Sequence, residues 1–207
     1  MARYTGPVCR LCRREKMKLF LKGAKCDTMR CPIEKKPYPP GVHGRGRIRE
    51  SEYMFQLREK QKARRIYGLL ERQFRNLYQR AAREKGITGE TLLCMLEQRV
   101  DNVVFRAGFA SSRNQARQWV RHGHVLVNGK RVTISSFMVR KGDVVEMAPK
   151  ARNMIVLRHN LDTIDRLVPM WLEAVTAEAK VTVRDLPLRD QIDVPVREQL
   201  IVELYSK

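Results

Sequence analysis

The sequence predicts an α+β protein made of an N-terminal extension, a mainly helical domain and a small module that combines two helices with a short-stranded sheet. Apolar residues recur at helical spacing between residues 51 and 107, whereas residues 111–147 contain a helix followed by short β-runs. The first 45 residues differ from both in being rich in cysteine, proline and basic residues. The expected boundaries are 1–45 for the extension, 46–94 completed by 158–207 for a discontinuous helical domain, and 95–157 for the module.

A short helix is expected to begin after Ser112. The Ser112 hydroxyl is a good N-cap, Gln115 stands at the third helical position to complete a capping box, and Gly123 is the expected stop. Because residues four apart share a face of a helix, one stripe carries three arginines: Arg113, Arg117 and Arg121. Three guanidiniums and a helix N-terminus suit phosphate groups. A solvated basic face is the alternative interpretation of the same pattern.

A β-hairpin is expected directly after this helix. Two short β-runs, at residues 125–127 and 130–134, flank Asn128-Gly129, which favours a type I′ turn because both central residues need a positive φ. Lys130 and Arg131 make the tip of the hairpin basic. Further apolar runs at 137–139 and 144–147, separated by a turn, complete the small sheet.

The net charge indicates a polyanionic partner. Lys and Arg number 42 against 22 Asp and Glu, and the formal charge of +20 favours nucleic acid over a membrane. The first 50 residues carry 14 basic and 4 acidic groups, whereas residues 151–207 carry 8 and 9, so the first three quarters of the chain should face the polyanion. No secretory signal and no apolar run of roughly 18 residues is present, which predicts an intracellular protein that makes no membrane contact.

Four of the five cysteines form two close pairs in the N-terminal extension: Cys9, Cys12, Cys26 and Cys31. Two thiol pairs on a small basic segment predict a tetrahedral zinc site, and the metal would supply folding energy that this charged segment lacks. An iron–sulfur cluster takes the same four thiolates and is the alternative cofactor. Incidental cysteines are the alternative without a metal. Cys94 lies in an apolar run and is expected to be a small core residue.

Basic residues also line the segments that precede the module. Residues 37–49 combine proline, glycine and arginine, which predicts an extended arm that becomes ordered on RNA, or else a flexible linker. Helices are expected over residues 51–67, 70–86 and 88–108, and in the third Arg99 and Arg106 lie one above the other. The candidate contacts on the first two helices are Arg58, Lys60, Lys62, Arg72 and Arg75.

The near-neutral segment from residue 158 onward is expected to pack back on the helical domain and to meet a protein neighbour instead of phosphate. Leu200, Ile201 and Leu204 have helical spacing and should face inward. Glu198 and Glu203 should remain outside, where they would favour a basic partner. The alternative is a segment that only closes the fold.

The module resembles the small RNA-binding domain shared by a ribosomal small-subunit protein, certain tRNA synthetases and certain pseudouridine synthases. The residues that carry this resemblance are Leu96-Glu97-Gln98-Arg99-Val100-Asp101-Asn102, Ser112-Arg113-Asn114-Gln115-Ala116-Arg117, His122-Gly123-His124 and Val127-Asn128-Gly129. Nearly the whole chain resembles one family, the bacterial small-subunit ribosomal protein number four, in its four-cysteine form. Its further motifs here include Gly6-Pro7-Val8-Cys9, Tyr38-Pro39-Pro40-Gly41 and Arg72-Gln73-Phe74-Arg75.

The resemblance implies a ribosomal protein of the cytoplasm, a primary binder of small-subunit rRNA that nucleates assembly of the subunit. It also implies contacts with neighbouring small-subunit proteins, a place near the mRNA where it enters the subunit, and an influence on translational accuracy. The candidate RNA-binding residues of the module are Arg99, Arg106, Ser112, Arg113, Gln115, Arg117, Arg121, His122, His124, Asn128, Lys130 and Arg131.

Two other classes of protein share parts of the pattern. An RNA-modifying enzyme would carry the module as a targeting domain, and Arg99-Val100-Asp101 imitates an arginine–aspartate catalytic pair. However, Asp101 lies among core residues, and no large catalytic domain is expected after it. A zinc-finger transcription factor would need a helix after the cysteines that reads a major groove, and the sequence predicts none. We therefore expect a protein that is not an enzyme.

Overall fold

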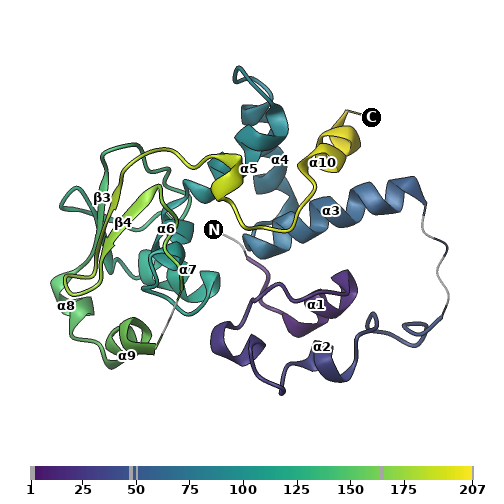
Figure 1. The fold of residues 1–207 in the computed structure, drawn as a ribbon, viewed down its shortest axis with the longest axis horizontal. Coiled ribbons are helices and arrows are strands. Elements are labelled where there is room, and N and C mark those ends of the chain that lie inside the picture. Colours follow the sequence, from purple (N-terminus) through teal and green to yellow (C-terminus); the bar gives the residue numbers. More distant parts are fainter. Residues whose placement is uncertain (1–2, 47–48, 50, 164–165, 207) are drawn as a thin grey trace. The chain divides into compact units, whose positions relative to one another are not determined.

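The chain folds into two compact units. The structure is a computed structural model that describes residues 3–46, 49, 51–163 and 166–206. The first unit comprises Met1–Leu92 together with Val194–Lys207, and the second comprises Leu93–Asp193 (Figure 1). Helices dominate the first unit, and a mixture of helices with an antiparallel sheet makes up the second, so the predicted α+β class is confirmed.

The first unit is built from short N-terminal helices, two longer helices and the C-terminal helix. Ser51 begins the longest helix as predicted, because its hydroxyl accepts a hydrogen bond from the Met54 N–H at 3.3 Å. The elements are α1 (Cys9–Glu15), η1 (Gly23–Cys26), α2 (Pro32–Lys35), α3 (Glu52–Ile66), α4 (Glu71–Ala81), the beginning of α5 (Thr88–Glu97) and α10 (Glu198–Tyr205).

The C-terminal helix α10 packs on α3 and closes the core of this unit. Ile201 is fully buried, and the Tyr205 ring stacks on the Tyr78 ring with centroids 4.4 Å apart. Leu200 and Leu204 are half-buried. The expectation that Glu198 and Glu203 remain outside is wrong. Both are half-buried, and the carboxylate of Glu203 accepts a hydrogen bond from the Gln56 side chain at 3.1 Å.

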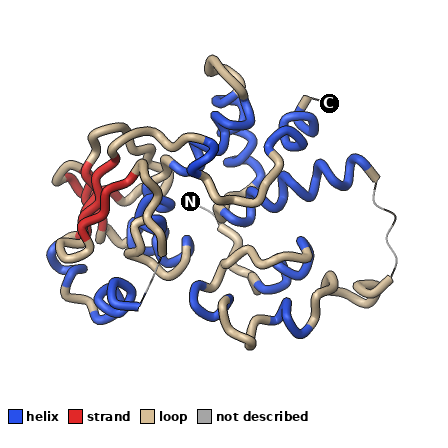
Figure 2. The backbone as a smooth tube through the Cα atoms, in the orientation of Figure 1, coloured by secondary structure: helices blue, strands red, loops and turns tan. Residues whose placement is uncertain are grey.

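The second unit packs helices against one sheet whose strands gather together in Figure 2. Among the described residues the sheet has five strands in the order β2-β1-β3-β5-β4, and each neighbouring pair is antiparallel. The elements are the end of α5, α6 (Val100–Arg106), α7 (Arg113–Arg121), β1 (Val125–Val127), β2 (Lys130–Val132), β3 (Val144–Met147), α8 (Pro149–Arg152), α9 (Ile155–Thr163), β4 (Leu172–Val175), β5 (Lys180–Val183) and η2 (Arg189–Gln191).

The predicted hairpin is confirmed. Val127 pairs with Lys130 across the turn, and φ is 50° at Asn128 and 75° at Gly129, the positive values that a type I′ turn needs. Val125 and Val127 point into the core, while Lys130 and Arg131 are exposed. One face of β1 is therefore buried, and the exposed Lys130 and Arg131 make the tip of the hairpin basic.

The segment that follows residue 158 differs from its predicted place. Strands β4 and β5 join the sheet of the second unit, where Val145 pairs with Val181. Without β5, the backbone of β3 would form an open edge with unpaired N–H and C=O groups. Trp171 and Leu157 also belong to the core of this unit, and only Val194–Lys207 returns to the first unit.

The helix expected over residues 88–108 is in fact two helices. The chain leaves the helical conformation at Arg99, where ψ is 135°, and Arg99 forms an isolated β-bridge with Met138. The Val100 N–H donates to the Phe137 carbonyl at 2.8 Å instead of to a helical partner. This break separates α5 from α6, so Arg99 and Arg106 do not lie one above the other on one helix.

Candidate nucleic-acid interface

Helix α7 begins at the predicted cap, but only half of the predicted capping box forms. The Ser112 hydroxyl accepts from the Gln115 N–H at 3.3 Å. The side-chain oxygen of Gln115 accepts from the N–H and the hydroxyl of Ser111, at 2.7 Å each, and from the side chain of Asn160. Gln115 therefore holds the loop before α7 to α9 and has a structural role.

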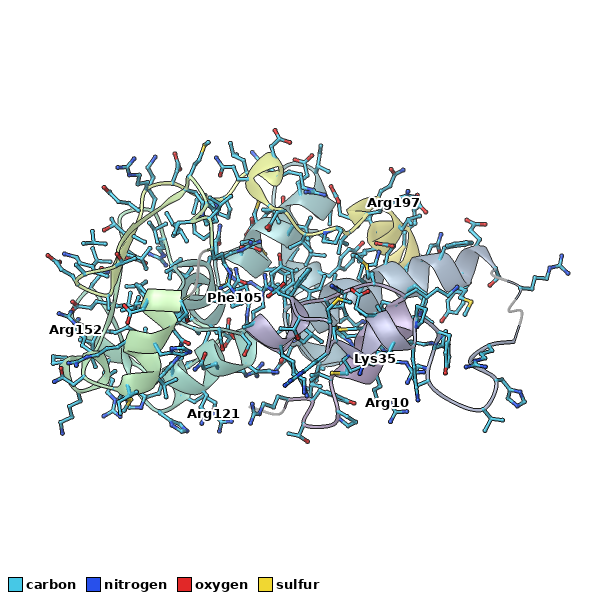
Figure 3. The ribbon with its side chains drawn as sticks, turned by 60° about the horizontal axis from the view of Figure 1, so that its bottom comes forward. Arg10, Lys35, Phe105, Arg121, Arg152 and Arg197 are labelled. Atoms are coloured by element: carbon cyan, nitrogen blue, oxygen red, sulfur yellow. The ribbon has the colours of Figure 1, made fainter. Side chains whose placement is uncertain are left out.

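The three arginines of α7 are not equally exposed. Arg121 is exposed at the surface of the unit (Figure 3), Arg113 is half-buried, and only 3% of Arg117 is exposed. Arg113 donates to the Asn102 side chain at 2.8 Å, and its guanidinium lies 4.3 Å from the centroid of the Phe105 ring. The interpretation of an open stripe of three guanidiniums is therefore wrong, because the first two turns of α7 pack on α6.

A buried carboxylate organises the charged groups behind α7. The side chain of Glu97 is 1% exposed and accepts two hydrogen bonds from Arg106, both at 2.9 Å. The Asn102 amide donates to the same carboxylate at 2.7 Å. Arg106 also forms an ion pair with the exposed Asp193 at 2.6 Å. Arg106, a candidate RNA contact, is thus committed to the interior of the unit.

Arg99 forms a second internal ion pair. Its guanidinium donates to both oxygens of Asp101, at 3.1 and 2.7 Å, and both residues are buried. Burial raises the pKa of the Asp101 carboxyl, and the charge and hydrogen bonds of Arg99 oppose that rise. The bidentate pair holds the start of α6 and leaves neither group open to a substrate.

The exposed basic residues among the candidates of this unit lie at the end of α7 and on the β1–β2 hairpin. The Arg131 guanidinium donates to the His122 carbonyl at 3.1 Å, which joins the hairpin to the helix end. The His122 and His124 rings lie 6.0 Å apart, and burial, followed by the charges of His122 and Arg131, lowers the pKa of His124. The exposed members are Arg121, His122, Lys130 and Arg131, and His124 is half-buried. We call these five residues the hairpin cluster.

The side chain of Asn128 is hydrogen-bonded to the start of β3. Its amide donates to Asp143 at 2.8 Å, and its oxygen accepts from the Val144 N–H at 2.9 Å. Asn128 therefore fixes the turn beside β3, and its role is structural.

In the first unit the predicted contacts fall into two groups. Lys60 is 8% exposed and forms an ion pair with Glu71 at 2.6 Å, and Lys62 is paired with Glu59. Arg58 donates to Glu15 at 3.3 Å. Only Arg72 and Arg75, on α4, are exposed among the five candidates of this unit.

The predicted metal ligands lie in the N-terminal segment of the first unit. Cys12, Cys26 and Cys31 are buried, and Cys9 is half-buried. Burial raises the pKa of the Cys12 thiol, and the charges of the other three cysteines raise it further. Over the described part of the chain, no group of three or more His, Cys, Asp or Glu side chains stands where it could hold a metal ion.

Two acidic residues that the sequence did not mark as partners of the basic side chains are Glu15 and Glu97. Glu15 is 1% exposed at its side chain and bridges α1 to Arg58 and Arg65 of α3. The available signal is a single acid within the basic run Arg13-Arg14-Glu15-Lys16. The signal for Glu97 is its position directly after the apolar residues of α5, where a charged side chain is unexpected.

None of the helices that the structure describes is both long and apolar enough to cross a membrane. The fold and the exposed cationic surface are those expected of a protein with a polyanionic partner. Two family models match: "Ribosomal protein S4/S9 N-terminal domain" over residues 3–97 and "S4 domain" over residues 98–145.

Curated relatives match over the full length of both chains. The small ribosomal subunit protein uS4 of Acidothermus cellulolyticus is 60% identical, that of Frankia alni 59% and that of Geotalea daltonii 57%, each over 100% of both chains. The chain belongs to the uS4 family of small ribosomal subunit proteins, which confirms the predicted family; the metal-binding form of it stays a prediction.

Proposed function

We infer that the chain is a structural component of the small ribosomal subunit in the cytoplasm, that it binds small-subunit rRNA, and that it is not an enzyme. Family membership over the full length supports this function, and so does the internal Arg99–Asp101 pair, which cannot act as a catalytic pair. The observation that carries the RNA contact is the hairpin cluster, an exposed basic surface on a rigid helix and hairpin. Such a surface fits the shape and phosphates of folded RNA more than a base sequence.

We propose that only some of the candidate residues contact RNA. Phosphate contacts should come from Arg121, His122, Lys130 and Arg131 in the second unit, and from Arg72 and Arg75 in the first. Ten of the other candidates hold the fold: Arg58, Lys60, Lys62, Arg99, Arg106, Ser112, Arg113, Gln115, Arg117 and Asn128. His124 is half-buried, and its ring packs edge-on against the Trp119 ring beside the proposed contacts.

Single substitutions in the hairpin cluster should weaken RNA binding in a salt-dependent way. Changing Arg121, Lys130 or Arg131 to Ala removes one phosphate contact, so the slope of log affinity against log salt should become shallower by roughly one. The measurement is a salt titration of binding to transcribed small-subunit rRNA. Arg184→Ala is the control of equal charge, because the Arg184 guanidinium is already paired with Glu173. If affinity and slope are unchanged in all three variants, the hairpin cluster is a solvated surface that does not contact RNA.

We further propose that Cys9, Cys12, Cys26 and Cys31 hold one zinc ion, with an iron–sulfur cluster as the alternative. The support is the choice of donors: three of the four thiols are buried, and all four belong to one short segment. A zinc ion would convert them to thiolates and tie α1, η1 and α2 together.

Elemental analysis of the purified chain tests this site. We expect about one zinc per chain, and Cys26→Ser should lower that content and make residues 3–35 sensitive to proteolysis. Cys94→Ser is the matched control, since Cys94 belongs to α5 and donates to the Pro187 carbonyl at 2.8 Å. The absence of both zinc and iron at stoichiometric levels would disprove the site.

Finer parts of the function are also proposals: early binding that nucleates subunit assembly, contacts with neighbouring proteins, mRNA near where it enters, and an influence on accuracy. Their support is membership of the uS4 family. For a protein neighbour there is further support in the division of charge, because residues 151–207 carry 8 basic and 9 acidic groups and have little electrostatic attraction to RNA. The exposed part of this segment suits a protein neighbour.

A further inference from the structure

Residues 36–39, which follow α2, are folded against α1, within a segment where the sequence predicts an extended arm. Arg13, on α1, donates from Nε to the carbonyls of Lys36 and Tyr38, each at 3.1 Å, and from Nη2 to the Pro39 carbonyl at 3.5 Å. Three carbonyls bound by one guanidinium fix the course of residues 36–39.

Glycine closes the other side of this loop. The Gly44 N–H donates to the Gly41 carbonyl at 3.2 Å, and the Gly46 N–H donates to the His43 carbonyl at 3.0 Å. A Cβ atom at Gly44 would collide with the Pro39 carbonyl oxygen, so the two arms of the loop approach more closely than any side chain allows. The result is a tight turn with exposed backbone.

A pocket of about 370 Å³ lies within this loop, lined by Lys16, residues 37–39 and residues 44–46. Its volume is within the range of small-ligand sites, roughly 300–1,000 Å³. Among the described residues that line it, two are basic, one is aromatic and none is acidic. The composition favours an anionic ligand with a flat group.

Two guanidinium groups lie close to the Tyr38 ring at the pocket. The guanidiniums of Arg13 and Arg45 lie 5.0 and 4.8 Å from the centroid of the Tyr38 ring. Arg45 is exposed and makes one long hydrogen bond, of 3.4 Å, to the Tyr38 hydroxyl. Unstacked RNA bases bind to such tyrosine and arginine planes, and a lysine side chain attracts the phosphate.

We propose that this pocket binds one unpaired nucleotide of the RNA, whose base stacks at Arg45 and Tyr38 and whose phosphate meets the Lys16 ammonium. This inference rests on the proposed function, since it assigns a subsite for the same RNA. Because the loop is already folded, the pocket is preorganised and little ordering opposes binding.

Arg45→Lys separates stacking from charge, because it keeps the positive charge and removes the plane. In full-length protein bound to transcribed small-subunit rRNA, Arg45→Lys should weaken binding roughly fivefold with an unchanged salt slope, and Arg45→Ala should weaken it about tenfold or more. Arg10→Ala is the control of equal charge: Arg10 is exposed on neighbouring α1 (Figure 3) and should change affinity less than twofold. In parallel, wild-type protein should protect an unpaired base from chemical modification, and Arg45→Lys should restore its reactivity.

Three results would overturn the proposal. Wild-type affinity in Arg45→Lys would exclude stacking, and an equal loss in Arg10→Ala would reduce the effect to general charge. Unchanged RNA affinity in Arg45→Ala, with a neighbouring protein missing from reconstituted subunits, would assign the pocket to an acidic protein segment. In each case, weakened binding by the hairpin-cluster variants would leave the proposed function intact.

Discussion

Glu97→Ala should destabilise the second unit by about 3–5 kcal/mol, the largest loss that we expect from a single substitution in this chain. The change removes the carboxylate that accepts two hydrogen bonds from Arg106 and one from Asn102, and it leaves a buried guanidinium without its main partner. Chemical denaturation, followed by the fluorescence of Trp119 and Trp171 in this unit, measures the free energy of unfolding.

Asp193→Ala provides the matched control for that experiment. Asp193 pairs with the same Arg106 at 2.6 Å, but its side chain is 77% exposed, so solvent screens the pair. We expect its free energy of unfolding to match that of the wild type within error. A free energy of unfolding in Glu97→Ala that equals that of the wild type would show that the buried pair does not stabilise the unit.

Glu15→Ala should have the second-largest effect, a loss of about 2 kcal/mol from the first unit. The Glu15 carboxylate is the shared partner of Arg58 and Arg65, and it joins α1, the helix that carries Cys9 and Cys12, to α3. Both guanidiniums are about a fifth exposed, so water partly compensates for the lost charge and the effect falls below that of Glu97.

Limited proteolysis of residues 3–45, together with the free energy of unfolding, measures this effect. Glu34→Ala is the control, because the Glu34 carboxylate pairs with Lys18 at an exposed position and should be replaceable. A protease-resistant N-terminal segment in Glu15→Ala would show that other contacts hold the segment. The proposed metal ion is the first such contact to test.

Local patterns predicted the central part of the molecule well. The Ser112 cap, helix α7 and the Asn128-Gly129 turn all depend on residues close in sequence, so their chemistry is visible without the fold. The uS4 family was also accessible from sequence, because its motifs run along most of the chain.

Long-range pairing was not predictable in the same way. Residues 180–183 have a β-pattern, but nothing within them indicates that β5 adds to β3 instead of packing on the helical unit. The stripe of α7 shows the same limit. Arg113, Arg117 and Arg121 are chemically identical in sequence, and only the packing of α6 against the first turns of α7 separates buried guanidiniums from the exposed one.

The candidate basic residues of this chain divide into internal ones that hold the fold and exposed ones that we expect to meet rRNA. Protein–RNA crosslinking in assembled small subunits, with the modified peptides identified by mass spectrometry, tests this division most directly. We expect crosslinks at Arg121–Arg131 of the hairpin cluster, at Arg72 and Arg75, and at Tyr38 or Arg45 in the loop pocket. Crosslinks confined to strands β4 and β5 or to α10, with none at those basic sites, would contradict the division.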